Sequence, residues 1–385
     1  MSKKKILKII ACCLTIVFLT VVAVLGGELV LLYKMAGSTA DPLRFLQTMN
    51  LLQRNYNGEV TPHQLFDGAI KGMVEAAGDP YTVYLNQKDY AQLNEMTNGS
   101  FGGIGIVFGK RGNDYVVISA LEDNAGAKAG IKSGDIIMGV DGQPTRDMNM
   151  EQVATKIRGE QGTEVELELK DKNGALRKVR VVREEIKNPS VGGQLIPNTK
   201  IGYIRIAVFN ENTGADFAKK YKELEEQGMQ ATILDLRGNP GGIFDAGVQV
   251  AGMLVPKGPI VSVIDKDGNK VTENSELESV KYPLAVLVDH GSASAAEIVA
   301  GAIKDTKSGK LFGVKTFGKG SVQSVYRLDR DTAVKITVAK YYTPSGVSIH
   351  NVGIEPDVKV ELPENATVDL QLKAAEEYLL GELQK

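Results

Sequence analysis

The sequence predicts a multidomain protein that combines an α/β core with an α+β region and an N-terminal helical region. The chain has 385 residues, which is enough for two or three domains. From residue 200 onward, apolar runs of strand length alternate with helical stretches, a pattern typical of an α/β core. Residues 41–98 instead show apolar residues at helical spacing, and a glycine-rich stretch with short alternating runs follows them.

The first 34 residues have the features of a membrane-targeting segment. Lys3, Lys4 and Lys5 precede an uncharged apolar run over residues 9–25, and a second apolar run follows at 29–33. Positive charge before such a run predicts a cytoplasmic N-terminus with the rest of the chain exported. No small-residue cleavage site follows. We therefore expect an uncleaved, single-pass transmembrane anchor in a bacterial cell membrane; a cleaved signal and a secreted protein are the alternative.

The two cysteines and the net charge limit the remaining partners. Cys12 and Cys13 both fall within this N-terminal segment, where packing in a membrane helix is the simplest explanation for them. An exported part without cysteine needs no disulfide, which suits a bacterial envelope protein. The formal net charge is −2 and no basic patch is evident, so nucleic acid is not expected as a partner.

The next region, residues 41–97, is expected to be helical. Asn57-Gly58 and Gly78-Asp79-Pro80 interrupt the pattern and divide it into short helices. The apolar positions at helical spacing are Phe45, Leu46, Met49, Leu52, Leu65, Ala69, Ile70, Met73 and Val74. A further helical stretch covers residues 368–383 near the C-terminus.

Residues 98–185 are expected to form a small peptide-binding domain. The sequence GGIGIV at 102–107 precedes strand-like alternation at 114–119 and 164–170. The segments AGAKAGIKSGDII at 125–137 and VDG at 140–142 resemble the interior motifs of PDZ domains. A glycine-rich loop before an edge strand offers backbone N–H groups to a peptide's terminal carboxylate, and the strand pairs with the peptide. The expected substrate-binding residues are Gly102, Gly103, Ile104, Gly105 and Ile106.

A candidate nucleophile follows the apolar run at 284–288. The sequence DHGSASAAEI at 289–298 predicts a tight turn between that strand and a helix beginning at Ala295, which places Ser294 at the helix N-terminus. There the N–H of Ala295 and the helix dipole face a developing anion. A serine before a helix is more often a cap, and that alternative applies to both Ser292 and Ser294.

A second oxyanion donor is predicted upstream. The sequence RGNPGG at 237–242 follows a strand expected at 231–236 and precedes a helix expected at 243–254. Glycine allows positive φ and close backbone approach, so the N–H of Gly241 or Gly242 can point into a pocket. An ordinary Pro-Gly turn is the alternative.

The sequence KTFGKGSVQ at 315–323 offers a general base. Burial disfavours the charged form of lysine and so lowers its pKa, which makes a lysine able to deprotonate serine. Lys319 lies between two glycines, which we expect to let its backbone approach the serine loop. The neutral amide of Gln323 can orient the amine without adding charge. Lys315 is the competing lysine, and either one alone is more often a surface residue.

The histidines and metal motifs argue against other protease mechanisms. The chain has three histidines, His63, His290 and His350, and none of them lies in a triad motif; His290 is also too close to Ser294 in sequence. No His-x-x-x-His pattern is present, so neither a metal site nor a cofactor is expected. A Ser-Lys dyad remains the simplest arrangement.

These motifs together resemble the C-terminal processing peptidases, also called tail-specific or carboxyl-terminal proteases. The resemblance rests on residues 291–302, 315–323, the sequence AKYYTPSG at 339–346 and the sequence GDPYTVYL at 78–85. It implies Ser294 as nucleophile, Lys319 as base, Gln323 as the residue orienting the lysine, and an oxyanion hole from Ala295 and the Gly241-Gly242 turn. Ala296 departs from the serine common in the family.

The resemblance also implies a domain plan. A crotonase-like (ClpP/crotonase) serine protease core is expected at residues 190–362, with an inserted PDZ domain at 98–185, the helical region at 41–97, the membrane segment at 1–34 and a C-terminal helical segment at 363–385. In the family the terminal helices often support a homodimer; a helical cap on the chain's own core is the alternative. Protein substrates bound by their C-termini are the implied partners.

Two other functions remain open at this point. A catalytically silent PDZ scaffold would bind C-terminal tails without needing Lys319. A crotonase-like acyl-binding enzyme would use the oxyanion turn for an enolate or thioester. The joint presence of Ser294, Lys319 and Gln323 favours the protease over both.

Overall fold

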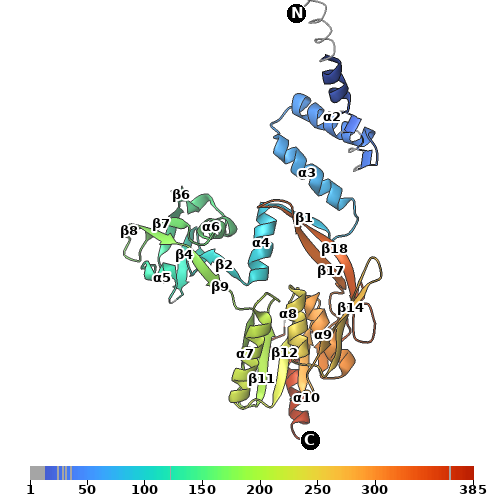
Figure 1. Ribbon diagram of the computed structural model, residues 1–385. Helices are drawn as coiled ribbons and strands as arrows, with labels where there is room; N and C mark the ends of the chain where they lie inside the picture. The colour runs from blue at the N-terminus through green and yellow to red at the C-terminus, as the bar shows by residue number, and fades with distance from the viewer. Residues whose placement is uncertain are drawn as a thin grey trace, which may run out of the picture. The chain divides into compact units, whose positions relative to one another are not determined.

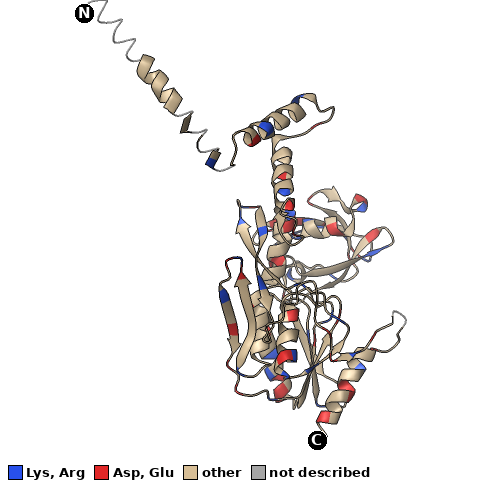
Figure 2. Cartoon of the chain, turned by 90° about the vertical axis from the view of Figure 1, so that its right-hand side faces the viewer, with Lys and Arg blue, Asp and Glu red and all other residues tan. Residues whose placement is uncertain are grey.

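The structure is a computed structural model that describes residues 14–23, 26–27, 30, 33–34, 37–121, 123–363 and 366–385. The chain divides into two compact units, residues 1–84 and 85–385. Figure 1 shows the helices and strands in chain order, coloured from blue to red. Basic and acidic side chains alternate along these elements without gathering on one of them (Figure 2).

The predicted transmembrane anchor is wrong. In the part of the chain that the structure describes, no helix is both long and apolar enough to cross a bilayer. The predicted localisation, as a single-pass protein of the cell membrane, is therefore wrong as well. Cys12 and Cys13 lie outside the described residues.

From residue 37 onward, the first unit contains helices α2 (Ala40–Asn55) and α3 (Pro62–Glu75). The break between them falls at Asn57-Gly58, as the sequence predicts. Helix α3 begins with a capping box, in which Thr61 and Gln64 exchange hydrogen bonds, and Pro62 at its first position suits the fixed φ of proline. Strand β1 (Val83–Leu85) follows the second predicted break, at Gly78-Asp79-Pro80.

The second unit starts with helix α4 (Gln87–Asn98) and then forms an antiparallel five-stranded sheet in the order β3-β4-β5-β7-β8. These strands are β3 (Ile106–Arg111), β4 (Asp114–Ala120), β5 (Ile136–Val140), β7 (Glu164–Lys170) and β8 (Leu176–Val182). The short β6 (Gln143–Pro144) pairs with β5. Helices α5 (Ala125–Lys128) and α6 (Met150–Ile157) and the 3₁₀ turn η1 (Thr145–Asp147) complete this domain.

This small domain has its own core and a two-stranded base. Alternate residues of β7, Val165, Leu167 and Leu169, are fully buried, as expected for a sheet with one covered face. Strands β2 (Ser100–Gly103) and β9 (Glu184–Lys187) pair antiparallel where the chain enters and leaves the domain. The domain is therefore inserted between α4 and the rest of the second unit.

A six-stranded sheet in the order β10-β11-β12-β15-β16-β19 forms the centre of the second unit. The strands are β10 (Val191–Leu195), β11 (Ile201–Ile206), β12 (Ala231–Asp235), β15 (Leu284–Val288), β16 (Lys310–Gly313) and β19 (Val358–Lys359). All neighbours after β10 pair in parallel. Strands β12 and β15 are buried at every position, as expected where helices cover both faces.

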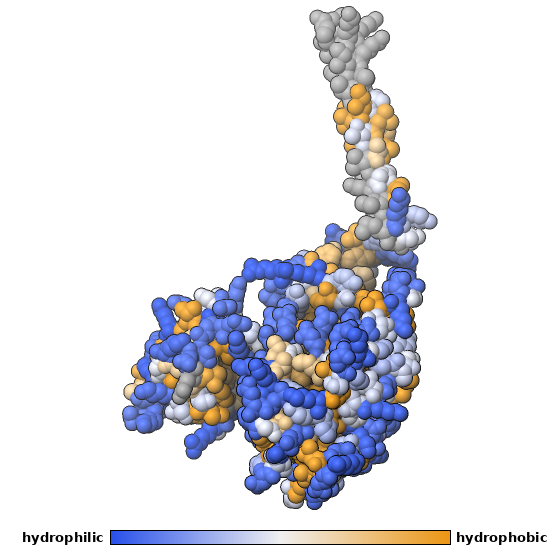
Figure 3. Space-filling model, turned by 60° about the horizontal axis from the view of Figure 1, so that its bottom comes forward, coloured by the Kyte–Doolittle hydropathy of each residue, from blue (hydrophilic) through white to orange (hydrophobic). Residues whose placement is uncertain are grey.

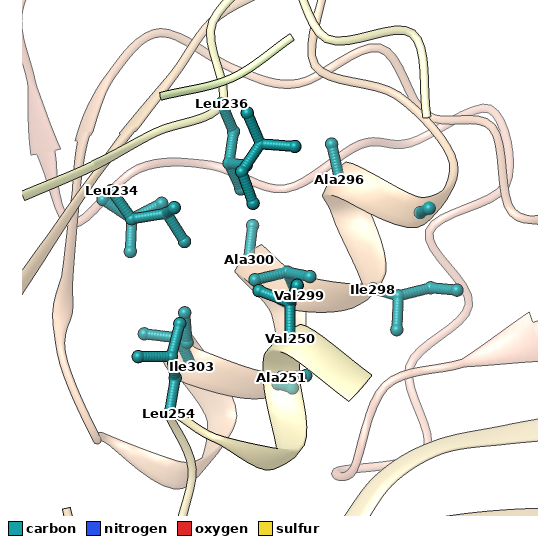
Figure 4. Close-up of a cluster of buried hydrophobic side chains, with 14 of the residues drawn as sticks. Leu234, Leu236, Val250, Ala251, Leu254, Ala296, Ile298, Val299, Ala300 and Ile303 are labelled. Atoms are coloured by element: carbon teal, nitrogen blue, oxygen red, sulfur yellow. The ribbon is translucent and has the colours of Figure 1, made fainter. Parts of the chain in front are cut away.

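Helices α7 (Thr213–Glu226), α8 (Phe244–Gly252) and α9 (Ala295–Thr306) share the main core with this sheet. Figure 4 shows Val250 and Ala251 of α8 against Val299, Ala300 and Ile303 of α9. Nine consecutive residues of α9, from Ala295 to Ile303, are buried. A helix buried all round has little freedom to shift, so its N-terminus is a rigid platform for a site.

The other face of the sheet is covered by the C-terminal helix α10 (Leu370–Glu382). Ala375 and Leu379 of α10 are fully buried against Ile233, Ala285 and Leu287. At its N-terminus, Asp369 accepts hydrogen bonds from the backbone of Leu372 and from the guanidinium of Arg237. Part of the predicted segment 363–385 thus packs on the chain's own core.

A second sheet completes the unit. Strand β13 (Gly258–Asp265) pairs antiparallel with β14 (Lys270–Ser275) and with β18 (Ala333–Tyr342). Strand β17 (Ser321–Arg327) pairs antiparallel with β18, and together they form a long hairpin. The hairpin begins directly after the predicted lysine, so its register decides which side chains face the site.

Candidate active site

Ser294 lies where the sequence predicts it, at the turn between β15 and α9. It is the N-cap of α9 with φ 55° and ψ −116°, a conformation that non-glycine residues rarely adopt. Residues held in such regions cost of order 1–3 kcal/mol and persist only where their surroundings enforce them. The turn is therefore constrained by the contacts described next.

The glycine turn 241–242 lies directly against Ser294. A Cβ on Gly241 would lie 2.6 Å from Ser294 Cβ and 2.9 Å from the Ala295 nitrogen, so only glycine fits there. The N–H of Gly241 donates to Asn239 Oδ1 at 2.8 Å. Among the described residues, no hydrogen-bond acceptor takes the N–H of Gly242 or of Ala295. Of the three predicted oxyanion donors, Gly242 and Ala295 are thus the ones available to a ligand.

Asp289 joins the glycine turn to the serine turn. Its Oδ1 accepts hydrogen bonds from the backbone N–H of Gly238 at 2.8 Å and of Gly291 at 2.9 Å. Ser292 is fully buried and donates to the Leu236 carbonyl at 2.8 Å. Ser292 therefore has a structural role in holding the two loops together.

Glu297, three residues after the serine, holds both halves of the predicted dyad. Its carboxylate accepts hydrogen bonds from the backbone N–H of Ser294 at 3.0 Å and of Lys319 at 2.8 Å. The N–H of Gly318 (2.7 Å) and the Thr316 hydroxyl (2.6 Å) complete four donors. Burial raises the pKa of the Glu297 carboxyl above its usual range, and the hydrogen bonds oppose that rise.

Tyr341 joins the same two residues from β18. Its hydroxyl lies 3.1 Å from the Ser294 carbonyl oxygen and within hydrogen-bond distance of the Lys319 carbonyl oxygen. The ring is buried. The backbones of Ser294 and Lys319 are therefore bound to each other on two sides, through Glu297 and through Tyr341.

The two candidate lysines lie in different surroundings. Lys319 lines the same groove as Ser294. Lys315 forms an ion pair with Glu355 at 3.1 Å and is 42% exposed, as a surface lysine would be. The glycines beside Lys319 have a different role from the predicted one, because a Cβ on Gly320 would meet His350 at 2.6 Å and not the serine loop.

Gln323 lies on β17 beside the groove. Its Nε2 donates to Ser321 Oγ at 2.9 Å and to Thr337 Oγ1 at 3.2 Å. These bonds fix the orientation of the amide, and its oxygen can act as an acceptor in the groove that Gln323 lines.

A groove of about 270 Å³ brings these groups together. Helix α4 contributes Leu93 and Met96 to one wall, and the hairpin β17–β18 contributes to another. No histidine of the described chain lines it, and His290 lines a different pocket. The remaining lining includes Pro240, Gly241, Gly242, Ile243, Phe244, Ser294, Ile298, Lys319, Ser321, Val322, Gln323, Val325, Lys335 and Tyr341.

A second groove, of about 300 Å³, lies in the inserted domain between β3 and α6. Gly103, Ile104, Gly105 and Ile106 line it, opposite Ala154 and Ile157 of α6. The fifth predicted binding residue, Gly102, pairs instead with Glu185 in the base sheet, and its carbonyl accepts from Gly159.

The sequence motifs contained Glu297, Tyr341 and Asp289, but no role was predicted for them. Glu297 and Tyr341 each bind at least one residue that lies 19 or more positions away in the sequence. Asp289 accepts a hydrogen bond from a backbone N–H on another loop. One local signal was present for Glu297, since serine followed three residues later by glutamate is a capping-box pattern.

Comparison with family models matches three segments of the chain. Residues 200–360 match peptidase family S41, residues 34–89 match the N-terminal domain of the activating protease CtpB, and residues 116–171 match the PDZ domain.

The chain is also similar to whole proteases. It is 36% identical over 333 residues to the carboxy-terminal processing protease CtpA of Bacillus subtilis, covering 86% of this chain and 71% of that one. It is 35% identical to the carboxyl-terminal-processing protease of Synechocystis sp., covering 81% and 76%. Among solved structures, the photosystem II D1 C-terminal processing protease matches with a TM-score of 0.50 and 32% identity over 88% of this chain and 96% of that one.

Proposed function

The chain belongs to the carboxy-terminal processing proteases of peptidase family S41 and carries a PDZ domain, and from that premise we propose that it cleaves protein substrates with a Ser294–Lys319 dyad. The observation that carries the proposal is the shared carboxylate of Glu297, which binds the backbone N–H of both residues beside one groove. A nucleophile and its general base must be held close to each other, and the shared carboxylate does this for the backbones of Ser294 and Lys319.

In the proposed mechanism the neutral amine of Lys319 takes the Ser294 hydroxyl proton as Oγ attacks the peptide carbonyl carbon. The C–N bond then breaks, Lys319 returns the proton to the leaving amine, and an acyl-enzyme remains. Water, deprotonated by the same amine, hydrolyses the ester and restores Ser294. Gln323 orients the lysine through its free amide oxygen.

The proposed oxyanion hole consists of the N–H groups of Ala295 and Gly242. Ala295 is at the N-terminus of the buried helix α9, where the dipole favours negative charge. The N–H of Gly241 is occupied by Asn239, so we assign Gly241 the role of allowing the close approach to Ser294.

We propose that the PDZ groove captures the substrate's C-terminus. Gly103 to Ile106 form its carboxylate side, and β3 offers an edge for strand pairing. Amidating a substrate tail removes the negative charge of the carboxylate to which those N–H groups would donate. It should slow cleavage of long substrates more than cleavage of short peptides that fill only the protease groove. Equal binding of free-acid and amidated tails would count against carboxylate capture.

The crotonase-like architecture of the core and the domain limits 41–97, 98–185, 190–362 and 363–385 are also part of the proposal. The parallel order β11-β12-β15-β16, with helices α8 and α9 behind the oxyanion turns, supports a crotonase-like core.

A homodimer through the N-terminal helices is proposed on an exposed apolar surface of α2 and α3. Phe45, Phe66 and Met73 are 41%, 44% and 70% exposed and line one hollow with Ala69 and Ile70. Exposed apolar surface of this kind is typical of an interface. Light scattering of the Phe66→Asp variant should show a monomer where the unchanged chain is a dimer.

The decisive experiment compares three variants against a protein substrate. Ser294→Ala should fold and lose activity by several orders of magnitude, as expected for loss of a covalent nucleophile. Lys319→Arg should be inactive because guanidinium stays protonated, whereas Lys315→Ala should keep most activity because its ion pair is on the surface.

The same variants separate the alternatives. A silent PDZ scaffold would bind tails equally well in all of them and would not react with an active-site serine probe. An acyl-binding enzyme would bind acyl-CoA and would not need Ser294. Full proteolysis by Ser294→Ala would end the dyad proposal.

A further inference from the structure

Strand β18 presents alternate residues to the active-site groove. The Tyr341 hydroxyl donates to the backbone carbonyls of Ser294 and Lys319. Thr337 Oγ1 accepts a hydrogen bond from the amide nitrogen of Gln323. Lys335 pairs across the hairpin with Val325 and Thr337 pairs with Gln323, and paired residues lie on one face of a sheet; a bulge interrupts the alternation between Thr337 and Ala339. Lys335 lies on that face and lines the groove.

The charge of this groove is unbalanced. In the described chain no carboxylate lines it, while two lysine side chains do, those of the proposed base Lys319 and of Lys335. Lys335 is half-buried, and none of the ion pairs between described residues includes it. A lysine in a mainly apolar groove without an acidic neighbour favours binding of an anion from outside.

We propose that Lys335 binds a carboxylate of the substrate during cleavage and so selects substrates that carry one at a fixed distance from the cleaved bond. This inference rests on the proposed protease function and deepens it. Lys335 is assigned to binding and not to the chemical step.

The register of the hairpin gives the distance. Lys335 faces Val325, and Thr337 faces Gln323. Two positions separate Lys335 from Thr337, which binds Gln323 beside the proposed base, about 7 Å at about 3.3 Å per residue. The side chains of Gln323 and Lys335 add to this span, so an extended substrate would place the carboxylate about two to four residues from the cleaved bond.

Two sources can supply this carboxylate, an Asp or Glu side chain and the free C-terminus of the chain being processed. Both offer the same acceptor oxygens to an ammonium group. A half-exposed ion pair of this kind should raise kcat/KM about five-fold for a substrate that carries the carboxylate, since water screens part of the attraction.

The experiment measures kcat/KM on the full chain with peptides of one length. In one series a Glu is moved along the sequence against Gln controls; in another the C-terminus is free or amidated. We expect about a five-fold preference for the carboxylate peptide at one or two positions in the unchanged protein. In Lys335→Met the ratio should fall to about one, and in Lys335→Glu a lysine-bearing peptide should be preferred.

Lys340→Met is the matched control, because Lys340 is an exposed lysine of the same strand that does not line the groove. It should leave the ratio unchanged. A preference that survives Lys335→Met overturns the proposal, and a surviving preference for the free C-terminus alone would belong to the PDZ groove. Cleavage of these peptides by Ser294→Ala would instead overturn the proposed function, whatever the ratio.

Discussion

Glu297 shows how one residue can determine the geometry of two others. It is fully buried, has no basic partner among its four donors, and makes all its hydrogen bonds to a hydroxyl and three backbone N–H groups. A carboxylate has two oxygens that accept about four hydrogen bonds, so the donor set saturates it.

Replacing Glu297 by Gln should therefore reduce kcat by about ten- to a hundred-fold with a smaller effect on KM. The amide keeps one acceptor oxygen and turns two N–H donors toward backbone donors, so about two hydrogen bonds are lost at about 1.5–3 kcal/mol each. Steady-state kinetics on a peptide substrate would measure the split. Glu355→Gln is the control because it alters a surface ion pair of the same loop region; equal losses in both variants would contradict the assignment.

The same substitution should change how stability depends on pH. The pKa of Glu297 is raised above its ordinary 4.5 by burial, so the folded state binds this proton more tightly than the unfolded state. The free energy of unfolding therefore decreases as pH rises from about 4.5 through the raised pKa, by at most about 1.4 kcal/mol per pH unit. Denaturant unfolding between pH 4 and 7 should show this slope reduced in Glu297→Gln; identical slopes would contradict it.

At the scale of single residues, the sequence predicted which side chains line one groove better than it predicted their hydrogen-bond partners. Ser294 and Lys319 do line one groove, and the spacing of their motifs was enough to find them. The role of Gly241 could not be predicted from the sequence. Its N–H donates to Asn239, two residues earlier, and the sequence pattern does not define the turn that brings these two residues together. The partners of Tyr341 lie 22 and 47 residues away, and no local pattern encodes such a distance.

At the scale of elements, helix α10 is tied to the strand that leads into the oxyanion turn. Arg237 is buried between Asp235 at the end of β12 and Asp369 at the start of α10. Its bond to Asp369 holds the pKa of that carboxyl below its usual range, against the effect of burial. Since Gly238 follows Arg237 directly, the position of α10 affects the turn.

Asp369→Ala should destabilise the protein by about 2–3 kcal/mol, because it removes a helix cap and one carboxylate partner of Arg237. Thermal unfolding measures the loss. Lys373→Ala in the same helix breaks only an exposed pair with Glu377 and should cost less than about 0.5 kcal/mol. A similar melting temperature for Asp369→Ala and the unchanged protein would show that α10 is not held this way.

Regular elements were predictable where the pattern was strong. The strands at 164–170 and 284–288 have the predicted bounds, and the helix expected at 243–254 runs from Phe244 to Gly252. The pairing of β13 with β18 was not predictable, since about 70 residues separate them. The membrane anchor failed because an apolar composition was taken for a spanning helix.

At the scale of the whole second unit, ion pairs join the inserted domain to its surroundings. Lys88 and Glu95 of α4 pair with Glu151 and Arg158 at 2.7 and 3.3 Å, and Arg330 of the hairpin lies 3.8 Å from Glu160. All are at least one-third exposed, so each contributes little to stability and is screened by salt. Figure 3 shows one face of the molecule, on which hydrophilic and hydrophobic residues are mixed.

Raising the ionic strength from about 0.05 M to about 0.5 M should therefore loosen α4 from the inserted domain. Hydrogen exchange of α4 should increase by up to about ten-fold, while exchange in the buried strand β15 stays constant. Exchange in α4 that does not respond to salt would mean that apolar contacts, and not charges, hold the domain.

The positive φ of Ser294 has a consequence beyond the reaction itself. Its surroundings hold the serine in a conformation that glycine would adopt with less strain, and the residue under strain is the proposed nucleophile. Selection for thermal stability and selection for catalytic turnover therefore favour different residues at position 294. A gene copy released from its proteolytic duty would drift toward glycine at position 294 and gain heat resistance as it did so.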